Sequence, residues 1–538
     1  MNTSTPPPAA AVTVIVIGYD DAGHVTDAVR SALGQGAAVT EVIAVDDCST
    51  DGSGALLDDL AAGEPRLRVV HRATNSGGCG TPRNDGIALA SSAYVMFLDS
   101  DDVLPPGAVD ALLGAAEKHD AAVAAGLCVR RELPSGHEVP WHPELYARAA
   151  VVGHPAHRRR LVQDTLCVNK LYRTDFLRTH DIRFPDGRFV YEDFVFTARV
   201  LAAGPRMALV PAPVYVWHVR RGAEKLSLSL DRAGIDNWRA RIDAHRTAVD
   251  ILLDASQKRL ARAARAHFLD HSLRMYAREL DLRGPEYRAE WWAVTRAYLA
   301  GFDAADFEAA PAPGRVVGRL VRAVDAPRDL PRVKEFAARP ARLLPPYAYA
   351  PDGTPAWSAE LPQVPLDHLL HRPMDVLPVA VDGELRPSAR GTRLTLRMHE
   401  LYGRVADAGP RSMDVELVDR RSGTVVQRRT AAVTALPDPS APEQWEATVL
   451  LDLSALGRSG TWDIRLRLHF ADGSHRDTTA HAVRRPGLLR RVAVPSRRHL
   501  VLLAQPYATH SGALALRTAP GLRGVVSVMR RRAARLLH

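Results

Sequence analysis

Cysteine is scarce in this chain, and long apolar runs are absent. Four cysteines occur among 538 residues, at positions 48, 79, 128 and 167, and no two of them have a metal-binding spacing. This scarcity argues against a disulfide framework and favours a reducing, cytosolic setting. Residues 1–11 are uncharged and proline-rich, and the apolar stretch at 12–17 is too short for a signal sequence or a membrane span. We expect residues 1–11 to be disordered.

Acidic residues are missing from the C-terminal segment. No aspartate or glutamate occurs between residues 484 and 538, a segment that holds twelve arginines, and the whole chain has a formal net charge of +9. Such an imbalance attracts nucleic acid, anionic lipid or a phosphate-rich polymer, or it simply makes a solvated basic face. Nucleic acid is disfavoured because the chain has no helix-turn-helix, zinc-finger or aromatic-basic pattern.

The N-terminal part alternates between strand and helix patterns. Strand patterns cover residues 12–17, 41–45, 67–71, 94–98 and 121–126, and helical patterns cover 22–33, 54–62, 82–90 and 106–119. This alternation predicts βαβ units and a parallel sheet. Polar residues follow three of the strands, at 19–20, 46–47 and 99–102. Ligands of open parallel sheets bind outside the carboxyl ends of the strands, so we expect a site there.

The remainder of the chain changes character twice. Residues 234–342 carry long helical patterns with apolar faces, and prolines then recur between 340 and 365 as in a linker. After about 366, alternating apolar and polar residues predict an antiparallel β-sandwich. We therefore predict a catalytic domain at 12–233, a helical and linker region at 234–365 and a β-sandwich at 366–485. Residues 486–538 would form a basic segment, part of a small β module that ends in a helix.

The tetrapeptide Asp99-Ser100-Asp101-Asp102 is the most informative feature of the chain. It directly follows the predicted buried strand at 94–98. Three carboxylates this close together repel one another unless a cation neutralises them. Oxygen-rich sites of this kind suit Mg²⁺ or Mn²⁺, which complete their coordination on substrate phosphates. The alternative is that Asp101 or Asp102 caps a helix that begins at Pro105-Pro106.

Seven motifs in the first 230 residues, taken in order, resemble those of the inverting GT-A glycosyltransferases of family two. They lie at residues 14–20, 43–53, 75–78, 82–87, 97–102, 169–173 and 191–194. The resemblance implies an α/β, Rossmann-like GT-A domain that uses a nucleotide-sugar donor and Mn²⁺ or Mg²⁺. It also implies a DXD motif, here Asp99-Ser100-Asp101.

The resemblance implies a set of donor-binding residues. Tyr19 would stack on the base, Asp47 would accept a hydrogen bond from the uracil imide, and Arg83 would reach the ribose or diphosphate. Ile17, Asn75 and Asp99 complete the predicted donor site, with Asp99 contacting ribose or metal-bound water. The alternatives are helix or turn capping for Asp46 and Asp47, and a plain glycine turn for Asn75.

The resemblance also implies residues for the metal, the phosphates and the chemistry. Asp101 would bind the metal together with His218, and Arg220 and Arg221 would clamp a phosphate. Asp193 would remove the acceptor's proton, with Glu192 orienting hydroxyl groups. The alternatives are a packing role for His218 and, for Asp193, the start of an ordinary helix.

The domain layout resembles that of bacterial enzymes that add N-acetylglucosamine to wall teichoic acid, a poly-ribitol-phosphate. It implies a hexosyl- or N-acetylhexosaminyltransferase with a UDP-sugar donor and an anionic polymer as acceptor. It further implies oligomerisation through the C-terminal β domain and a cytoplasmic enzyme, with contact to the anionic inner face of the membrane. The alternatives are a transferase for capsular polysaccharide or lipid-linked glycan, and a non-catalytic glycan-binding scaffold.

Overall fold

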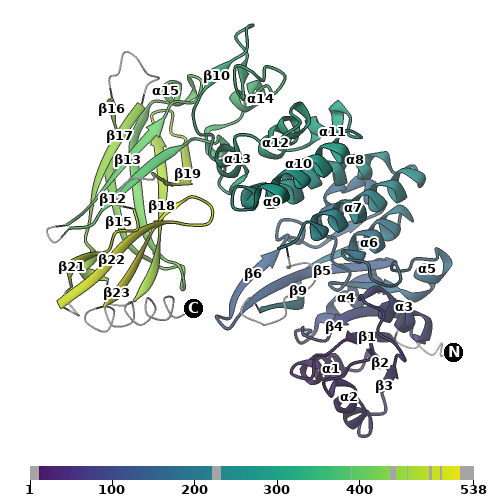
Figure 1. Ribbon diagram of the computed structural model, residues 1–538. Coiled ribbons are helices and arrows are strands. Elements are labelled where there is room, and N and C mark those ends of the chain that lie inside the picture. The colour runs from purple at the N-terminus through teal and green to yellow at the C-terminus, as the bar shows by residue number, and fades with distance from the viewer. Residues whose placement is uncertain are drawn as a thin grey trace, which may run out of the picture. The chain divides into compact units, whose positions relative to one another are not determined.

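The computed structural model of this protein describes residues 11–220, 232–388, 391–436, 444–456, 459–483, 488–496 and 500–520. The chain divides into two compact units, and Figure 1 labels their elements. The first unit is Met1–Phe268 with Gly301–Ala309, and the second is Leu269–Ala300 with Ala310–His538. Within the described ranges, no helix has both the length and the apolar character needed to cross a bilayer.

The first unit is built on one mixed sheet. Its strands are β1 (Val12–Gly18), β2 (Val39–Asp46), β3 (Leu67–His71), β4 (Tyr94–Asp99), β5 (Val123–Leu133), β6 (His137–Trp141), β7 (Ala150–Val152), β8 (Lys170–Arg173) and β9 (Met207–Arg220). Its helices are α1 (Val25–Leu33), α2 (Ser53–Ala61), α3 (Gly80–Leu89), α4 (Ala108–Lys118), α5 (Thr174–Thr179), α6 (Glu192–Ala202), α7 (Asp236–Asp254), α8 (Lys258–His267) and α11 (Ala304–Ala309).

The strand order is β3-β2-β1-β4-β8-β5-β9-β7, with β6 paired to β5. The first four strands are parallel, as the sequence predicted, and β1 lies between β2 and β4. The chain order therefore reverses at β1, which makes its carboxyl end a topological switch point. β8 is antiparallel to both neighbours and separates β4 from β5. The sequence did not predict this strand, because only four residues of it pair.

Burial explains why these strands form where they do. Residues 12–17 of β1 and 94–98 of β4 are buried, as expected for strands covered on both faces. The predicted helices and strands of this part agree with the observed elements to within a few residues, apart from the longer β5. The prediction of an N-terminal α/β, GT-A-like domain is confirmed.

The second unit contains helices followed by strands. Its helices are α9 (Arg274–Leu280), α10 (Pro285–Leu299), α12 (Ala312–Ala323), α13 (Leu330–Ala337), α14 (Asp367–Leu370) and α15 (Arg404–Ala408). A short hairpin joins β10 (Ala348–Tyr349) to β11 (Pro355–Ala356). The remaining strands are β12 (Val381–Arg386), β13 (Thr392–His399), β14 (Pro410–Asp419), β15 (Val425–Ala432), β16 (Thr434–Leu436), β17 (Gln444–Leu451), β18 (Gly460–Phe470), β19 (His475–Thr479), β20 (His481–Ala482), β21 (Val492–Ser496), β22 (Leu500–Ala508) and β23 (Leu514–Pro520).

The later strands form two sheets, ordered β16-β17-β13-β12-β20 and β15-β14-β18-β23-β22-β21, with β19 paired to β18. Among the described strands of these two sheets the pairings are antiparallel, apart from the parallel pair of β12 with β20. Along β13, β17 and β18 the side chains alternate between buried and more exposed, as they do when one face of a sheet lies on a core. The predicted C-terminal β-sandwich is confirmed.

A buried ion pair joins the helical part of the second unit to its strands. Arg342 and Glu335 have side chains that are 1% and 4% exposed, and Arg342 Nε donates to Glu335 Oε2 at 2.9 Å. The same guanidinium donates to Thr479 Oγ1 and to the carbonyl of Ser511. The segment before residue 366 and the strands after it therefore share one compact unit. The exact domain boundaries proposed from the sequence stay predictions.

Candidate active site

The register of the parallel strands brings two acidic loops to the same edge of the sheet. Gly18 at the end of β1 pairs with Asp46 on β2, and Ile17 pairs with Asp99 on β4. The two aspartates thus flank the carboxyl end of β1. This is the edge where the sequence predicted a site.

The Asp99–Asp102 turn is fixed by its neighbours rather than by a helix. Asp102 is 3% exposed and accepts hydrogen bonds from the Tyr215 hydroxyl and the His218 backbone amide, both at 2.7 Å. Ser100 Oγ donates to Asp21 Oδ2 at 2.8 Å. Helix α4 begins at Ala108 after a Gly107 N-cap, so the alternative that Asp101 or Asp102 caps this helix is wrong.

Asp101 projects from this turn beside the end of β9. Its side chain is 47% exposed, and Arg220 Nη1 lies 3.4 Å from its Oδ2 and 3.1 Å from its backbone oxygen. Partial removal of its carboxylate from water, together with repulsion from Asp99 and Asp21, raises the pKa of Asp101 to about 6 although Arg220 opposes the shift. A carboxylate held against like charges is a favourable place for a cation.

The ring of His218 is oriented by the same turn. Its Nδ1 lies 3.1 Å from the backbone oxygen of Asp101, and because that oxygen only accepts, Nδ1 carries the proton. Burial lowers the pKa of His218, so the ring is neutral near pH 7 and its Nε2 keeps a lone pair. A histidine whose other nitrogen donates to a backbone carbonyl is the usual form of a metal ligand.

The metal prediction is only partly supported by this geometry. Among the residues that the structure describes, no three His, Cys, Asp or Glu side chains are arranged to hold a metal ion. Asp101 and His218 are suitable donors for Mn²⁺ or Mg²⁺, but a cation held by these two residues would need further ligands from a bound substrate.

Arg83 on α3 joins the two carboxylate groups that the sequence placed in different motifs. Its side chain is 3% exposed, and Nη2 lies 2.7 Å from Asp99 Oδ1. Its Nη1 lies 2.8 Å from Glu192 Oε1 and 3.2 Å from Asp193 Oδ1. The guanidinium is therefore shared among three carboxylates, and its predicted contact with the donor stays a prediction.

Glu192 and Asp193 open helix α6. The residue before them, Tyr191, has a left-handed backbone (φ 68°), and neither carboxylate caps the helix, although the helix dipole favours both in the first turn. Burial raises the pKa of both carboxyls, while the charge of Arg83 works against this rise. The backbone amide of Cys167 also donates to Asp193 Oδ2 at 3.4 Å. A carboxylate with a raised pKa in this environment is suited to act as a base near neutral pH.

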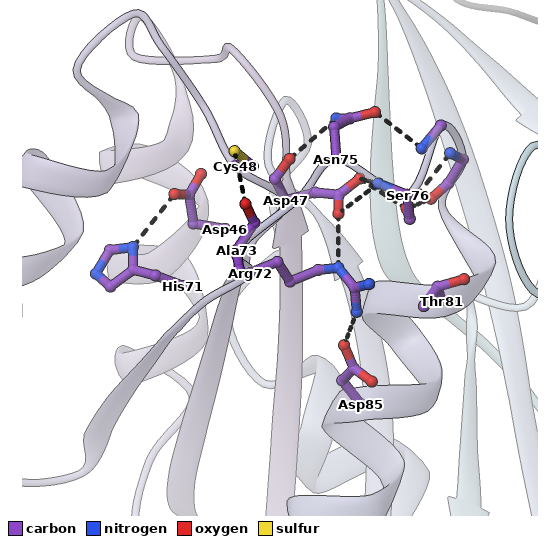
Figure 2. A network of polar contacts seen from close by, with 12 residues as sticks. Asp46, Asp47, Cys48, His71, Arg72, Ala73, Asn75, Ser76, Thr81 and Asp85 are labelled. Carbon is purple, nitrogen blue, oxygen red and sulfur yellow. Dashed lines mark hydrogen bonds and ion pairs between the residues drawn. The ribbon is translucent and has the colours of Figure 1, made fainter.

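Asp47 sits in a separate polar network, which Figure 2 shows. Arg72 Nε lies 2.9 Å from its Oδ1, and Ser76 donates to the same carboxylate through its amide at 3.1 Å and its hydroxyl at 2.7 Å. Arg72 also pairs with Asp85 on α3. These contacts engage both oxygens of Asp47. The nucleobase of a bound donor must therefore share or replace the hydrogen-bond donors of Ser76.

The residues around Asp47 hold the loop that follows β3. Asn75 Nδ2 donates to the backbone oxygen of Asp47 at 2.9 Å, and its Oδ1 accepts from the Gly77 amide at 2.8 Å (Figure 2). Gly77 has a φ of +79°, as the glycine-turn alternative requires. Asp46 accepts from Ser49 and lies 3.2 Å from His71 Nδ1, which fits a turn-stabilising role. The carboxylates of Asp58 and, to a smaller extent, Asp46 accept hydrogen bonds from the His71 ring and raise the pKa of His71.

The other predicted site residues differ in exposure. Tyr19, just beyond β1, is 42% exposed and is accessible to a flat ligand. The side chain of Ile17 is 5% exposed and packs in the core, so it can reach a donor only through its backbone. Arg221 lies outside the described residues. Binding roles for all three stay predictions.

Several residues that organise the site were not predicted from the sequence. Tyr215 and Asp21 hold the Asp99–Asp102 turn, and Asp164 forms a buried ion pair with Lys170 at 2.9 Å. Lys170 belongs to the motif at 169–173, and because a lysine on a buried strand is rare, its position there indicates an internal partner. Tyr215 carries no local pattern, because its partner Asp102 is distant in the sequence. Asp164 lies only six residues before Lys170, but no pattern of regular structure marks its position.

The sequence of this chain is similar to those of known proteins. The model of the family described as Glycosyl transferase family 2 matches residues 13–180. The succinoglycan biosynthesis protein ExoO of Rhizobium meliloti (strain 1021) is 33% identical over 273 residues, which cover 47% of this chain and 74% of that protein. The poly(ribitol-phosphate) β-N-acetylglucosaminyltransferase TarS of Staphylococcus aureus (strain MW2) is 29% identical over 216 residues, or 40% of this chain and 36% of TarS.

A solved structure extends the likeness in fold. The crystal structure of S. aureus TarS matches with a TM-score of 0.51 at 17% identity, over 95% of this chain and 85% of that one. The likeness therefore covers both the α/β part and the C-terminal strands. The chain belongs to glycosyl transferase family 2, and it is a glycosyltransferase, as the sequence predicted.

Proposed function

We propose that this enzyme transfers a sugar, with inversion, from a UDP-sugar to a hydroxyl group of an anionic cell-envelope polymer. The observation that carries the proposal is the Arg83 guanidinium, which bridges Asp99 on the DXD turn and the Glu192-Asp193 pair. Arg83 thus lies between Asp99, which is suited to bind the donor, and the Glu192-Asp193 pair, which is suited to supply the general base. Among sugars we favour N-acetylglucosamine, since a TarS fragment with this fold was crystallised with UDP-GlcNAc.

Asp193 acts as the base in this proposal. The acceptor oxygen forms a bond to the anomeric carbon, the bond from that carbon to the phosphate oxygen breaks, and UDP departs with the bonding electrons. The hydroxyl proton moves to the Asp193 carboxylate. Arg83 favours the ionised form of Asp193, and Glu192 orients hydroxyl groups beside it.

A divalent cation would be held by Asp101 and His218. When bound, it would supply Lewis-acid stabilisation of charge on the departing diphosphate. The exposed Asp101 carboxylate and the oriented His218 ring support this assignment. Arg220 beside them, and Arg221 after it in the sequence, would contact the donor phosphates.

The nucleobase of the UDP-sugar would lie near Asp47, at the carboxyl edge of the sheet. Tyr19 offers an exposed ring for stacking, and Asp47 offers carboxylate oxygens to the imide of uracil. Cytosine has an acceptor nitrogen where uracil has its imide N–H, so a site made by Tyr19 and Asp47 should favour uracil over cytosine.

The acceptor is proposed to be a phosphate-rich polymer such as poly-ribitol-phosphate. The acid-free segment from 484 to 538 supports a polyanionic partner. A second candidate is a polysaccharide without backbone phosphate, which the likeness to a succinoglycan biosynthesis protein favours. We further propose that the enzyme works in the cytoplasm at the inner membrane face and assembles through its β-sandwich.

Two measurements on the full chain test the proposal. Thermal unfolding with UDP, UDP-GlcNAc, UDP-glucose, CDP or GDP, with and without Mn²⁺, should show stabilisation by the uracil nucleotides, about 2.7 kcal/mol at a ligand concentration of 100 Kd. UDP release with poly-ribitol-phosphate should exceed release with an uncharged glucan. Equal stabilisation by CDP would remove the uracil assignment, and preference for the glucan would favour the second candidate.

A further inference from the structure

A buried lysine contacts the loop that precedes it in the sequence, and the same loop contacts the proposed base. Lys170 opens β8, and its side chain is 5% exposed. Its ammonium lies 2.9 Å from Asp164 Oδ2 and 2.9 Å from Asn169 Oδ1. It also donates to the backbone oxygens of Asp164 and Leu166. A single cation therefore contacts both ends of the loop at 164–169.

The same loop is attached to helix α6 on its other side. The Thr197 hydroxyl donates to the backbone oxygen of Thr165 at 3.0 Å. The Cys167 amide donates to Asp193 Oδ2 at 3.4 Å, and the Cys167 carbonyl accepts from the Tyr172 hydroxyl at 3.0 Å. Asp193 and Thr197 are four residues apart and share one face of the helix. The loop is thus held between a buried cation and the helix that carries the base.

The buried charges make this arrangement stiff. Asp164 is 1% exposed, and although burial opposes it, the charge of Lys170 holds the pKa of Asp164 below its usual range. Tyr146 and Asn169 donate to the same Asp164 oxygen. Removing the lysine alone would leave the Asp164 carboxylate buried without its cation, which is strongly destabilising. For the same reason, a movement of the loop that separates the two charges carries a large free-energy penalty.

We propose that Lys170 is a positioning residue for the transfer reaction, fixing the loop at 164–169 so that the Cys167 amide is aimed at Asp193. The inference rests on the proposed function of Asp193. The amide donates to the ionised carboxylate and so favours the form that accepts a proton. A displacement of about 1 Å at such a group can lower kcat by roughly 100-fold.

The test uses a variant that removes both buried charges at once, because Lys170→Met alone can fail to fold. Asp164→Asn combined with Lys170→Met is nearly isosteric and leaves no unpaired charge. We expect kcat to fall by about 10- to 100-fold, with the Kd for UDP unchanged. The matched control is Tyr146→Phe, which removes the hydrogen bonds that the Tyr146 hydroxyl makes with the Asp164 and Asn169 side chains but no contact with the loop backbone. Its kcat should stay within about twofold of wild type.

A second readout separates positioning from general loss of structure. The charged groups that face Asp193 are Arg83, Glu192 and Asp99, and the double variant leaves all three in place. The Cys167 thiol faces Asp193 as well and, like the Cys167 amide, lowers the pKa of Asp193, so both belong to the loop that the variant disturbs. Loss of the hydrogen bond from the Cys167 amide would therefore raise the pKa of Asp193. The acidic limb of the pH profile of kcat would then move to higher pH. Thr197→Val, which removes the other loop contact, should move it in the same direction.

The outcomes are distinguishable from a failure of the proposed function. Hydrogen exchange of peptides covering 161–172 should be faster in the double variant and unchanged in Tyr146→Phe. If the wild-type chain releases no UDP from any UDP-sugar, the proposed function fails, and the exchange rates still decide whether Lys170 holds the loop. An active wild type with normal kcat and an unshifted pH profile in the double variant overturns the inference. Equal loss in Tyr146→Phe, or unchanged exchange in the double variant, overturns it as well.

Discussion

Replacing Asp193 by asparagine separates catalysis from stability at the centre of the proposed site. The amide keeps the shape of the side chain but cannot take up the acceptor's proton. Removing a general base typically slows a reaction by about 10²- to 10⁴-fold, which corresponds to roughly 3–5 kcal/mol on the activation barrier. We expect kcat for transfer to fall by that factor and the affinity for UDP to stay unchanged.

The change in stability should be much smaller, because two effects oppose each other. Asp193→Asn gives up a charged contact with Arg83 at 3.2 Å, worth roughly 1.5–3 kcal/mol. It also removes a carboxyl whose pKa is raised in the folded protein. Burial makes this carboxyl costly to ionise in the folded state, and that cost grows as pH rises from the unfolded pKa to the folded one, so removing the carboxyl offsets the missing contact. Arg83 retains Asp99 at 2.7 Å and Glu192 at 2.8 Å.

The assay compares UDP release in the presence of acceptor with denaturant unfolding of the same preparations. The expected pattern is a large loss of kcat with a change in unfolding free energy of under about 2 kcal/mol. Glu192→Gln is the matched comparison, since it removes the neighbouring carboxylate without removing the proposed base, and it should lower kcat less. If Asp193→Asn retains kcat within tenfold of wild type, or if Glu192→Gln is the more damaging change, the base is wrongly assigned.

Three further results are expected. Asp101→Ala should abolish stimulation by Mn²⁺ together with transfer, and Mn²⁺-stimulated turnover in this variant would contradict its ligand role. His71→Gln should reduce unfolding free energy at pH 5.5 but not at pH 8.5, because the aspartates that contact His71 raise its pKa. That contribution is complete below the unfolded pKa and is lost as pH rises through the folded one; an equal effect at both pH values would refute it. Arg342→Met should lower unfolding free energy by about 3–5 kcal/mol, because it leaves the buried Glu335 carboxylate without its arginine, with only the His481 ring 3.9 Å away. Adding Glu335→Leu should restore most of that loss, and a double variant no more stable than Arg342→Met alone would argue against the ion pair.

The parts of the site that the sequence predicted are those with local signals. Asp99, Asp101 and Asp193 follow or open regular elements, so their hydrophobic neighbours locate them along the chain. The order of the parallel strands then brings Asp46 and Asp99 to either side of β1, as expected for the carboxyl edge of such a sheet. The contacts that these side chains make were harder to predict from the sequence. Arg83 was predicted to face the donor, yet its guanidinium lies among three carboxylates from distant segments.

The sequence by itself determined the two kinds of core, because a continuous apolar run and a strict alternation bury different faces and need no knowledge of partners. It also determined the acidic residues at the strand ends, since strand termini are set by local pattern. Only the tertiary structure decided that Lys170 faces Asp164, that Tyr215 holds Asp102 and that Arg342 joins helices to strands. A buried polar group must find a partner wherever the fold provides one, and that partner can lie more than a hundred residues away.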